Sequence, residues 1–410
     1  MRRHTGGTMI KKKKNHKDHE DFGKEDRKKP GKLRRFAAAA EESDFPLRLF
    51  TTILVIIGII MIFSASYYYS ISREGTPYAY LIKQGVYAVM GFILMNIASN
   101  VDYHILRKYS VAIMAVSLAL LLLLFTPVAS TVYGATRWIR FGPVSIMPGE
   151  ISKLAMIIFA SAFFAQDSKK AESLKEMLPL LVLVGIVAIL IKKQPNLSTA
   201  ITVVVIVAGI AFLAGLKKSY IVLAVAAGAV LFAAVASFGP SYQKDRIFSF
   251  LDPFESVKGE GYQVVQSLLA LGSGGLKGLG IGKGVQKTLY LPEPHTDFIL
   301  SIVGEETGFI GIAVLMILFM LLVWRCFVIS LKAPDRFGMY LSGGLGIMVG
   351  VQVLLNVAVV TSSMPPTGVA LPFISYGGNS LWIFMFMVGV VLNISKQSGK
   401  NICRGYTDQD

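Results

Sequence analysis

The chain has 410 residues, of which 53% are hydrophobic and 16% are charged, and its mean hydropathy is +0.58. This apolar content exceeds what the core of a soluble protein of this length could bury, so a soluble fold is excluded. The net charge of +16 does not indicate nucleic-acid binding, because fourteen Lys or Arg residues lie within residues 1–45, where a basic tail beside anionic lipid is expected.

Long apolar segments recur along the rest of the chain. A helix that crosses about 30 Å of hydrocarbon at about 1.5 Å per residue needs roughly 20 apolar residues. The sequence therefore predicts an all-α integral membrane protein, a polytopic bundle of about ten transmembrane helices, between a disordered basic tail (1–45) and a C-terminal tail (397–410). The predicted spans within the helical domain (46–396) are 46–69, 78–98, 105–127, 150–166, 177–193, 199–216, 219–238, 298–329, 338–360 and 379–395.

The positions of Lys and Arg predict how these spans are oriented. Basic residues near spans tend to stay in the cytoplasm. They are frequent in every second connection, whereas the segment 361–378 has no charged residue and the segment 239–297 balances six basic against six acidic residues. Both termini are therefore expected to be cytoplasmic, with 239–297 forming a long extracytoplasmic loop between helices 7 and 8. Cys326 and Cys403 both fall on the cytoplasmic side, where no disulfide is expected.

The connection 128–149 is rich in residues that could bind a ligand. Arg137 and Arg140 flank Trp138, and Glu150 follows at the start of the next span. Trp138 could equally be an interfacial anchor, and Glu150 could simply be favoured by the helix dipole. Lys153 favours a functional role, because it shares a helix face with Glu150 inside the span, where an unpaired charge is costly.

The long loop 239–297 contains Arg246 and Asp252 in its first part and seven glycines within residues 272–284. A phosphate-binding P-loop is excluded, because position 277 is Lys and position 284 is Gly, so the required spacing fails at both ends. The glycines are expected to form tight turns and to allow the backbone to approach a partner closely.

Asp297 lies at the mouth of the eighth span. It could cap that helix, and Glu305 and Glu306 could pair with cations inside the bundle. Alternatively, Asp297 is a partly desolvated carboxylate with a raised pKa suited to general-base catalysis, and Glu305 lies about two turns further along, near the same face. Zinc is not expected, because only two histidines, His104 and His295, lie outside the tail, on opposite predicted sides.

Five segments in order resemble the SEDS family (shape, elongation, division and sporulation), whose members include FtsW, RodA and SpoVE. They are "GATRWIRFGPVSIMPGEISK" (134–153), "QPNLSTA" (194–200), "GYQVVQSLLALGSGGLKGLGIGKGVQK" (261–287), "YLPEPHTDFILSIVGEETGFIG" (290–311) and "PPTGVALPFISYGGNSL" (365–381). The string "LPEPHTDF" favours the FtsW and SpoVE side of the family. Asn196 replaces the more frequent aspartate, so a role of that position as base or cation ligand does not carry over.

The resemblance implies ten membrane helices and an inverting peptidoglycan glycosyltransferase that polymerises lipid II, an undecaprenyl-diphosphate-linked disaccharide-pentapeptide, at the outer face of the bacterial cytoplasmic membrane. It implies a class B penicillin-binding protein as partner, with other divisome or elongasome membrane proteins and membrane lipids, and no nucleic acid. The family's essential aspartate maps onto Asp297. The residues assigned to substrate binding are Arg137, Trp138, Glu150, Lys153, Arg246, Lys287, His295 and Glu305. No cofactor is assigned, and a divalent cation (Mg or Mn) is left open.

Two other functions are compatible with these residues. A lipid II flippase would also use buried charges such as Lys153 and Glu305, although it should distribute them through the bundle. A non-catalytic division scaffold that recruits a transpeptidase would instead depend on its cytoplasmic tail. The concentration of unusual residues on the outer side favours the polymerase.

Overall fold

The computed structural model describes residues 44–132, 135–141, 144–194, 196–220, 222–223, 226, 254, 261–366 and 368–407. Nearly all of the predicted basic tail, most of the predicted span 219–238 and the first part of the long loop, including Arg246, lie outside these residues.

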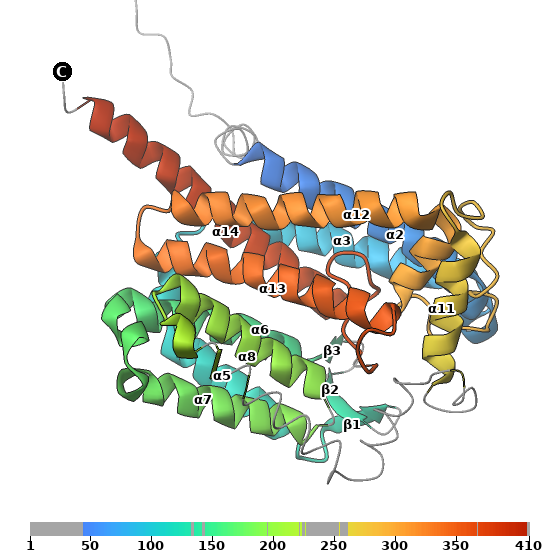
Figure 1. Cartoon of the computed structure of the whole chain (residues 1–410), viewed down its shortest axis with the longest axis horizontal. Coiled ribbons are helices and arrows are strands. Elements are labelled where there is room, and N and C mark those ends of the chain that lie inside the picture. The colour runs from blue at the N-terminus through green and yellow to red at the C-terminus, as the bar shows by residue number, and fades with distance from the viewer. Residues whose placement is uncertain are drawn as a thin grey trace, which may run out of the picture. The chain divides into compact units, whose positions relative to one another are not determined.

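The described residues are mostly helical (Figure 1). Seven of their helices are long and apolar enough to cross a membrane, and two shorter apolar helices, α5 and α8, accompany them. Nine of the predicted spans therefore correspond to described helices, and the number ten stays a prediction. The helices are α2 (Phe45–Glu74), α3 (Ala79–Ala98), α4 (His104–Lys108), α5 (Ser110–Leu123), α6 (Pro148–Gln166), α7 (Leu174–Lys192), α8 (Leu197–Leu213), α11 (Tyr262–Gly274), α12 (Ile299–Leu331), α13 (Arg336–Val360) and α14 (Gly378–Thr407), with a 3₁₀ turn at Ser168–Glu172.

The structure differs from the predicted all-α bundle in three places. The connection 128–149 forms a three-stranded antiparallel sheet of β1 (Ala129–Val132), β2 (Ala135–Phe141) and β3 (Val144–Ile146), in the order β1-β2-β3. The segment predicted as loop before the eighth span contains the helix α11, and α14 continues past the predicted end of its span. β1 and β3 have only four and three residues, too few for an alternating pattern to stand out, and they are held by pairing with β2.

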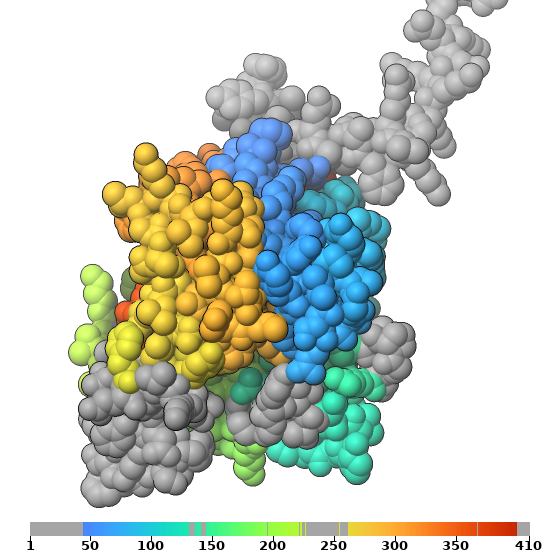
Figure 2. All heavy atoms as spheres, turned by 90° about the vertical axis from the view of Figure 1, so that its right-hand side faces the viewer, coloured from blue at the N-terminus to red at the C-terminus, as the bar shows by residue number. Residues whose placement is uncertain are grey.

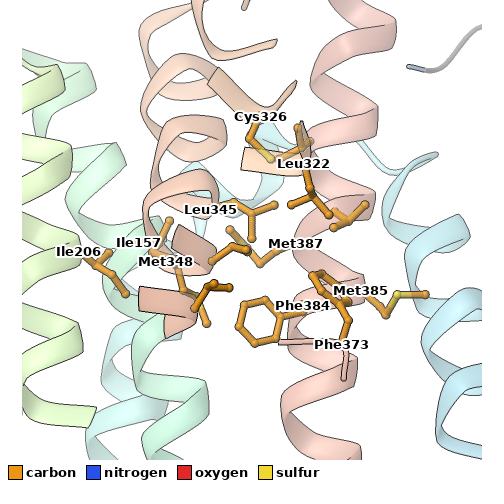
Figure 3. Packing of buried hydrophobic residues seen from close by; sticks show 14 of the residues in the cluster. Ile157, Ile206, Leu322, Cys326, Leu345, Met348, Phe373, Phe384, Met385 and Met387 are labelled. Atoms are coloured by element: carbon orange, nitrogen blue, oxygen red, sulfur yellow. The ribbon is translucent and has the colours of Figure 1, made fainter. Parts of the chain in front are cut away.

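The core lies where α6, α8, α12, α13 and α14 meet (Figure 3). Ile157 on α6, Ile206 on α8 and Met348 on α13 are fully buried there. Close packing of α13 depends on glycine, since a Cβ on Gly344 would lie 2.8 Å from Cγ2 of Ile157. Small residues let helices approach in this way when no water drives their association.

The two ends of the bundle carry different elements (Figure 1). The sheet and α11 lie at one end, and the start of α2 and the end of α14 lie at the other. At that second end, Arg325 of α12 binds the carboxylate of Asp44 through Nε and Nη2, at distances of 2.9 and 2.6 Å. This charged pair attaches the first turn of α2 to α12.

The glycine-rich part of the loop docks into a break in α12. Gly308 has φ of 69° and ψ of −170°, so the helix ladder is interrupted there. The amide groups of Leu279 and Gly280 donate to the carbonyls of Glu305 and Glu306, both at 2.9 Å. A Cβ on Gly278 would lie 2.2 Å from the Glu306 carbonyl oxygen, which only glycine allows. The predicted close backbone approach is confirmed, and the partner is α12.

Figure 2 shows this segment, coloured yellow, next to the blue helices at the N-terminal side of the bundle. Lys287 and Glu293 connect it to α2: Lys287 Nζ donates to Ser64 Oγ at 2.8 Å, and Tyr69 Oη donates to Glu293 at 3.4 Å. The loop after α11 is therefore attached to α12 on one side and to α2 on the other.

Candidate active site

Asp297 lies immediately before α12, two residues ahead of the first helical residue. Its side chain is partly buried and lines a cavity at the end of the bundle that carries the sheet. The backbone around it is held by the segment that precedes α14: Tyr376 N donates to the His295 carbonyl at 2.9 Å, and Ser375 Oγ donates to the Thr296 carbonyl at 2.7 Å. The carboxylate is thus presented from a fixed backbone rather than from a free loop.

Gly368 brings the backbone of this same segment against the carboxylate. Its φ of 69° is in the left-handed region that favours glycine. A Cβ placed there would lie 3.2 Å from Asp297 Oδ2 and 3.7 Å from Arg137 Nη1. Gly368 therefore lies next to both the carboxylate and the guanidinium, and any side chain at this position would narrow the space beside them.

The start of α6 contributes a buried ion pair. Pro148 occupies the first turn, where its missing N–H costs no helical hydrogen bond, and Glu150 follows in the same turn. Lys153 Nζ donates to Glu150 Oε1 at 2.6 Å, with the two side chains 4% and 11% exposed. The predicted shared helix face is confirmed. Within the described residues, Glu150 Oε2 is buried and has no hydrogen-bond partner.

Strand β2 supplies the basic and aromatic side chains on one wall of the cavity. Arg137, Trp138 and Arg140 all line the cavity, while Ile139 between them is fully buried. The strand is placed by pairing on both sides, with Trp138 opposite Ser130 of β1 and Arg140 opposite Ser145 of β3. Asn379, at the start of α14, donates to the Ser145 carbonyl at 2.7 Å and ties the sheet to the bundle.

These segments enclose a cavity of about 480 Å³. Three cationic side chains, Arg137, Arg140 and Lys153, face three carboxylates, Glu150, Glu293 and Asp297. A concave pocket with several convergent charged and polar groups is typical of a ligand-binding or active site. The other lining residues are Trp138, Ser145, Met147, Thr199, Thr202, Thr296, Gly368, Val369, Ala370, Tyr376, Gly377, Asn379 and Ser380.

The electrostatic environment of Asp297 suits a base. Burial, together with the negative charge of Glu293, raises the pKa of Asp297 to about 6, and the positive charge of Arg137 partly offsets this shift. A carboxyl group with this pKa is ionised at neutral pH and still accepts a proton more readily than an ordinary aspartate.

His295 lies behind the cavity wall rather than in it. Its side chain is 3% exposed and is surrounded by the rings of Tyr69, Tyr80 and Tyr376, with centroid separations of 4.9, 4.6 and 5.5 Å. Burial lowers the pKa of His295 to about 4, so the ring is neutral at physiological pH. This position does not support direct contact between His295 and the substrate. The imidazole ring instead packs against Tyr376, which lines the cavity.

Lys287 and Glu305 do not reach the cavity. Glu305 accepts hydrogen bonds from the backbone amides of Val285 and Gln286, at 2.7 and 3.2 Å, and so caps the glycine-rich turn. Lys287 is paired with Glu306 at 2.5 Å and with Ser64 of α2. Helical spacing predicts Glu305 near the same face as Asp297, but the loop folds back and its backbone amides bind the Glu305 carboxylate.

The structure thus brings together Asp297, Arg137, Trp138, Glu150 and Lys153 from the predicted set, while Arg246 lies outside the described residues. Residue-by-residue reasoning missed the contributions of α8, the segment 368–377 and the start of α14. Thr199, Gly368 and Asn379 all fall within stretches already noted for their family resemblance, which was the available signal.

The described residues contain no group of three or more His, Cys, Asp or Glu side chains placed to hold a metal ion. A divalent cation at this cavity would therefore take most of its ligands from a diphosphate and from water, as Mg²⁺ commonly does.

Residues 46–400 match the family model of FtsW, RodA and SpoVE, described as "Cell cycle protein". Among similar proteins, "Probable peptidoglycan glycosyltransferase FtsW" of Geobacter sp. (strain M18) is 38% identical over 359 residues, which cover 87% of this chain and 97% of the relative. "Stage V sporulation protein E" of Bacillus subtilis (strain 168) is 39% identical over 357 residues, covering 87% and 97%.

Two solved structures share the fold. A chain from a study of the structural coordination of polymerization and crosslinking by a peptidoglycan synthase complex superposes with a TM-score of 0.73 at 27% identity, covering 87% of this chain and 98% of that one. The rod shape determining protein RodA of Thermus thermophilus superposes with a TM-score of 0.63 at 26% identity, covering 87% and 97%.

Proposed function

This chain belongs to the FtsW, RodA and SpoVE family and is a peptidoglycan glycosyltransferase of the membrane, and we propose that it polymerises lipid II with Asp297 as the catalytic base. The observation that carries this proposal is the position of Asp297: a partly desolvated carboxylate, next to Arg137 and Gly368, on the wall of a cavity with mixed charge.

The proposal puts the cavity at the outer face of the cytoplasmic membrane, with both termini in the cytoplasm. Two observations support this orientation. Short connections at the opposite end are enriched in Lys and Arg, as expected for the cytoplasmic side. The start of α2 and the end of α14 lie at the end of the bundle away from the sheet and the cavity (Figure 1).

A polymerase outside the cell has no nucleoside triphosphate available, so its donor must already be activated, as a lipid diphosphate is. In the proposed step, the 4-hydroxyl of the acceptor N-acetylglucosamine attacks the anomeric carbon of the donor N-acetylmuramic acid. Asp297 accepts the hydroxyl proton as the new C–O bond forms, and the bond from that carbon to the phosphate oxygen breaks on the opposite face. Configuration is inverted, giving a β-1,4 link, and undecaprenyl diphosphate leaves with the bonding electrons.

The leaving diphosphate needs positive charge, and the cavity offers it. Arg137, Arg140 and Lys153 line the same space as Asp297. Preorganised cations stabilise charge that develops in the transition state without having to reorganise. Because Glu150 holds Lys153 at 2.6 Å, the ammonium group is positioned before substrate arrives.

The proposed partner is a class B penicillin-binding protein acting as transpeptidase. Support comes from the similar chain that belongs to a peptidoglycan synthase complex coordinating polymerization and crosslinking. Other division or elongation proteins of the membrane are further candidate partners.

The test is a reconstitution. The purified chain with its cognate transpeptidase, in vesicles containing fluorescent lipid II, should produce glycan strands that a muramidase digests. If labelled lipid II crosses the bilayer while no glycan forms, the protein is a flippase. If neither occurs but the transpeptidase is bound, it is a scaffold.

The rate of lipid II polymerisation should fall on the acid side of about pH 6, the value to which burial raises the pKa of Asp297. This fall is the acid limb of the pH profile. Above that pH the carboxylate is ionised and can accept the proton. Below it the group is already protonated, so kcat/KM should fall by roughly tenfold for each pH unit. Initial polymerisation rates measured from pH 4.5 to 8 at subsaturating lipid II give this limb.

Glu293→Gln sharpens the pH test. Because Glu293 raises the pKa of Asp297 through its negative charge, its removal should move the acid limb to lower pH by roughly half a unit or more. Glu172→Gln, a change of an exposed carboxylate in the 3₁₀ turn after α6, is the matched control and should leave the limb in place. A limb that does not respond to Glu293→Gln would mean that another group titrates.

A further inference from the structure

Three consecutive peptide carbonyls before α12 are each bound by a donor from the C-terminal third of the chain. Tyr376 N binds the carbonyl of His295 and Ser375 Oγ binds that of Thr296. Asn356 Nδ2 completes the set by donating to the Asp297 carbonyl at 2.7 Å. The peptide that carries the proposed base is therefore held from outside its own element.

Asn356 also donates a second hydrogen bond, to a carbonyl on another segment. Its Nδ2 also donates to the carbonyl of Val369 at 2.7 Å. Val369 follows Gly368, whose Cα faces the Asp297 carboxylate and Arg137. The amide group of Asn356 thus connects the Asp297 peptide to the Gly368–Val369 segment on the other side of the cavity. Both N–H groups of this amide are used.

The hydrogen bonds of Asn356 indicate that this side chain does more than fill space in the core. Asn356 is 1% exposed, and among the described residues its Oδ1 has no hydrogen-bond partner. Burying an unsatisfied carbonyl oxygen is costly, and a leucine of similar volume would fill the same space without that cost. The side chain is therefore best explained by its two donated hydrogen bonds.

We propose that Asn356 is a positioning residue for the glycosyl transfer: its amide sets the distance between the Asp297 peptide and the Gly368 wall, and so places the carboxylate against the acceptor hydroxyl. The role acts through Asp297 and rests on the proposed function of that residue. A misplacement of about 1 Å costs on the order of 100-fold in rate, which is the scale of effect expected here.

The test uses Asn356→Leu, with Gln352→Leu as a matched control. Gln352 lies one turn earlier on α13 and is also 1% exposed, and its Nε2 has no hydrogen-bond partner among the described residues. Both variants replace a buried amide by an apolar side chain in the same helix. Only Asn356→Leu removes the bonds to Asp297 and Val369.

Asn356→Leu in complex with the transpeptidase should lower kcat for lipid II polymerisation by about 10-fold to 100-fold while KM changes by less than about threefold, because binding groups remain in place. The acid limb should move to lower pH, since a carboxylate freed from its position gains solvation. The groups that face it, Arg137 of β2, Glu293 of the loop and the Glu150 and Lys153 pair of α6, are unchanged. Gln352→Leu should retain wild-type kcat and the same limb.

Hydrogen exchange of the peptide covering residues 293–298 gives a readout independent of catalysis. It should be faster in Asn356→Leu than in wild type and unchanged in Gln352→Leu. If Asn356→Leu does not fold, Asn356→Ser, which is smaller and too short to reach both carbonyls, replaces it with the same expectations.

Wild-type kcat and an unmoved acid limb in a folded Asn356 variant would overturn the positioning role. Asp297→Asn, measured alongside, separates this failure from that of the proposed function. If Asp297→Asn polymerises normally, the assigned base is wrong and the positioning role falls with it. If Asp297→Asn is inactive while the Asn356 variant is normal, only the positioning role is lost.

Discussion

Asp297→Asn is expected to reduce glycan polymerisation by about 100-fold to 10,000-fold, the range that loss of a general base produces. The amide has nearly the same shape as the carboxylate but cannot accept the acceptor hydroxyl proton. Folding and assembly should be unaffected, because the bonds that hold this peptide go to its backbone carbonyls. The measurement is single-turnover conversion of fluorescent lipid II by the purified complex, with thermal stability recorded in parallel.

Asp335→Asn is the matched control for this substitution. Asp335 also precedes a transmembrane helix, α13, and its Oδ1 caps that helix by accepting from Gly338 N at 3.1 Å. It lies at the other end of the bundle, and asparagine can accept the same hydrogen bond. Polymerisation by Asp335→Asn should match wild type. An Asp297→Asn protein as active as this control would show that the proton goes elsewhere.

Lys287→Met should lower the free energy of unfolding by about 3–5 kcal/mol. Lys287 Nζ lies 2.5 Å from Glu306 Oε1, with the two side chains 2% and 0% exposed. Ser64 Oγ of α2 donates to the same carboxylate at 2.7 Å. Removing the lysine leaves a buried carboxylate without its charged partner where α2, α12 and the loop meet. Unfolding in detergent, followed by intrinsic fluorescence, measures the loss.

Two further variants identify the cause of that loss. Lys83→Met breaks the exposed pair with Glu74, whose side chains are 45% and 41% exposed, and should cost less than about 1 kcal/mol. The double variant Lys287→Met/Glu306→Leu removes both buried charges and should recover most of the stability, because apolar replacements of a buried pair are often neutral. Equal losses in Lys287→Met and Lys83→Met would contradict the buried arrangement.

The double variant also tests what the sequence suggested for Lys287. The structure places this residue at the junction of the loop with α2 and α12, away from the cavity. A folded double variant should therefore polymerise lipid II at close to the wild-type rate. Loss of polymerisation without loss of stability would restore the assignment of Lys287 to substrate binding.

Much of this protein was predictable from local patterns. Hydropathy located nine of the described apolar helices, because the length of a span follows from the thickness of the bilayer. The pairing of Glu150 with Lys153 followed from helical spacing, since side chains three residues apart share a face. Asp297 stood out because a carboxylate at the mouth of an apolar helix is costly without a purpose.

The wall of the cavity could not be predicted in the same way. Arg137, Glu150, Asp297 and Gly368 come from a strand, a helix start, a loop end and a second loop, and only the packing of the bundle brings them together. Glu305 has the right helical phase to join them, yet the glycine-rich loop docks into the break at Gly308 and uses that carboxylate as a cap. Asn356 has a polar side chain in an apolar helix, and its partners are backbone carbonyls that no sequence pattern reveals.

The amino-acid sequence alone was enough to predict the apolar helices, the end of the bundle that carries the unusual charges and the carboxylate to test. These depend on hydropathy and helical periodicity, which act over neighbouring residues. The tertiary structure decided which charges line the cavity, which are used to anchor the loop and what holds Asp297 in place. Those outcomes depend on contacts between segments far apart in the chain, such as the hydrogen bond from Asn356 to the Asp297 carbonyl.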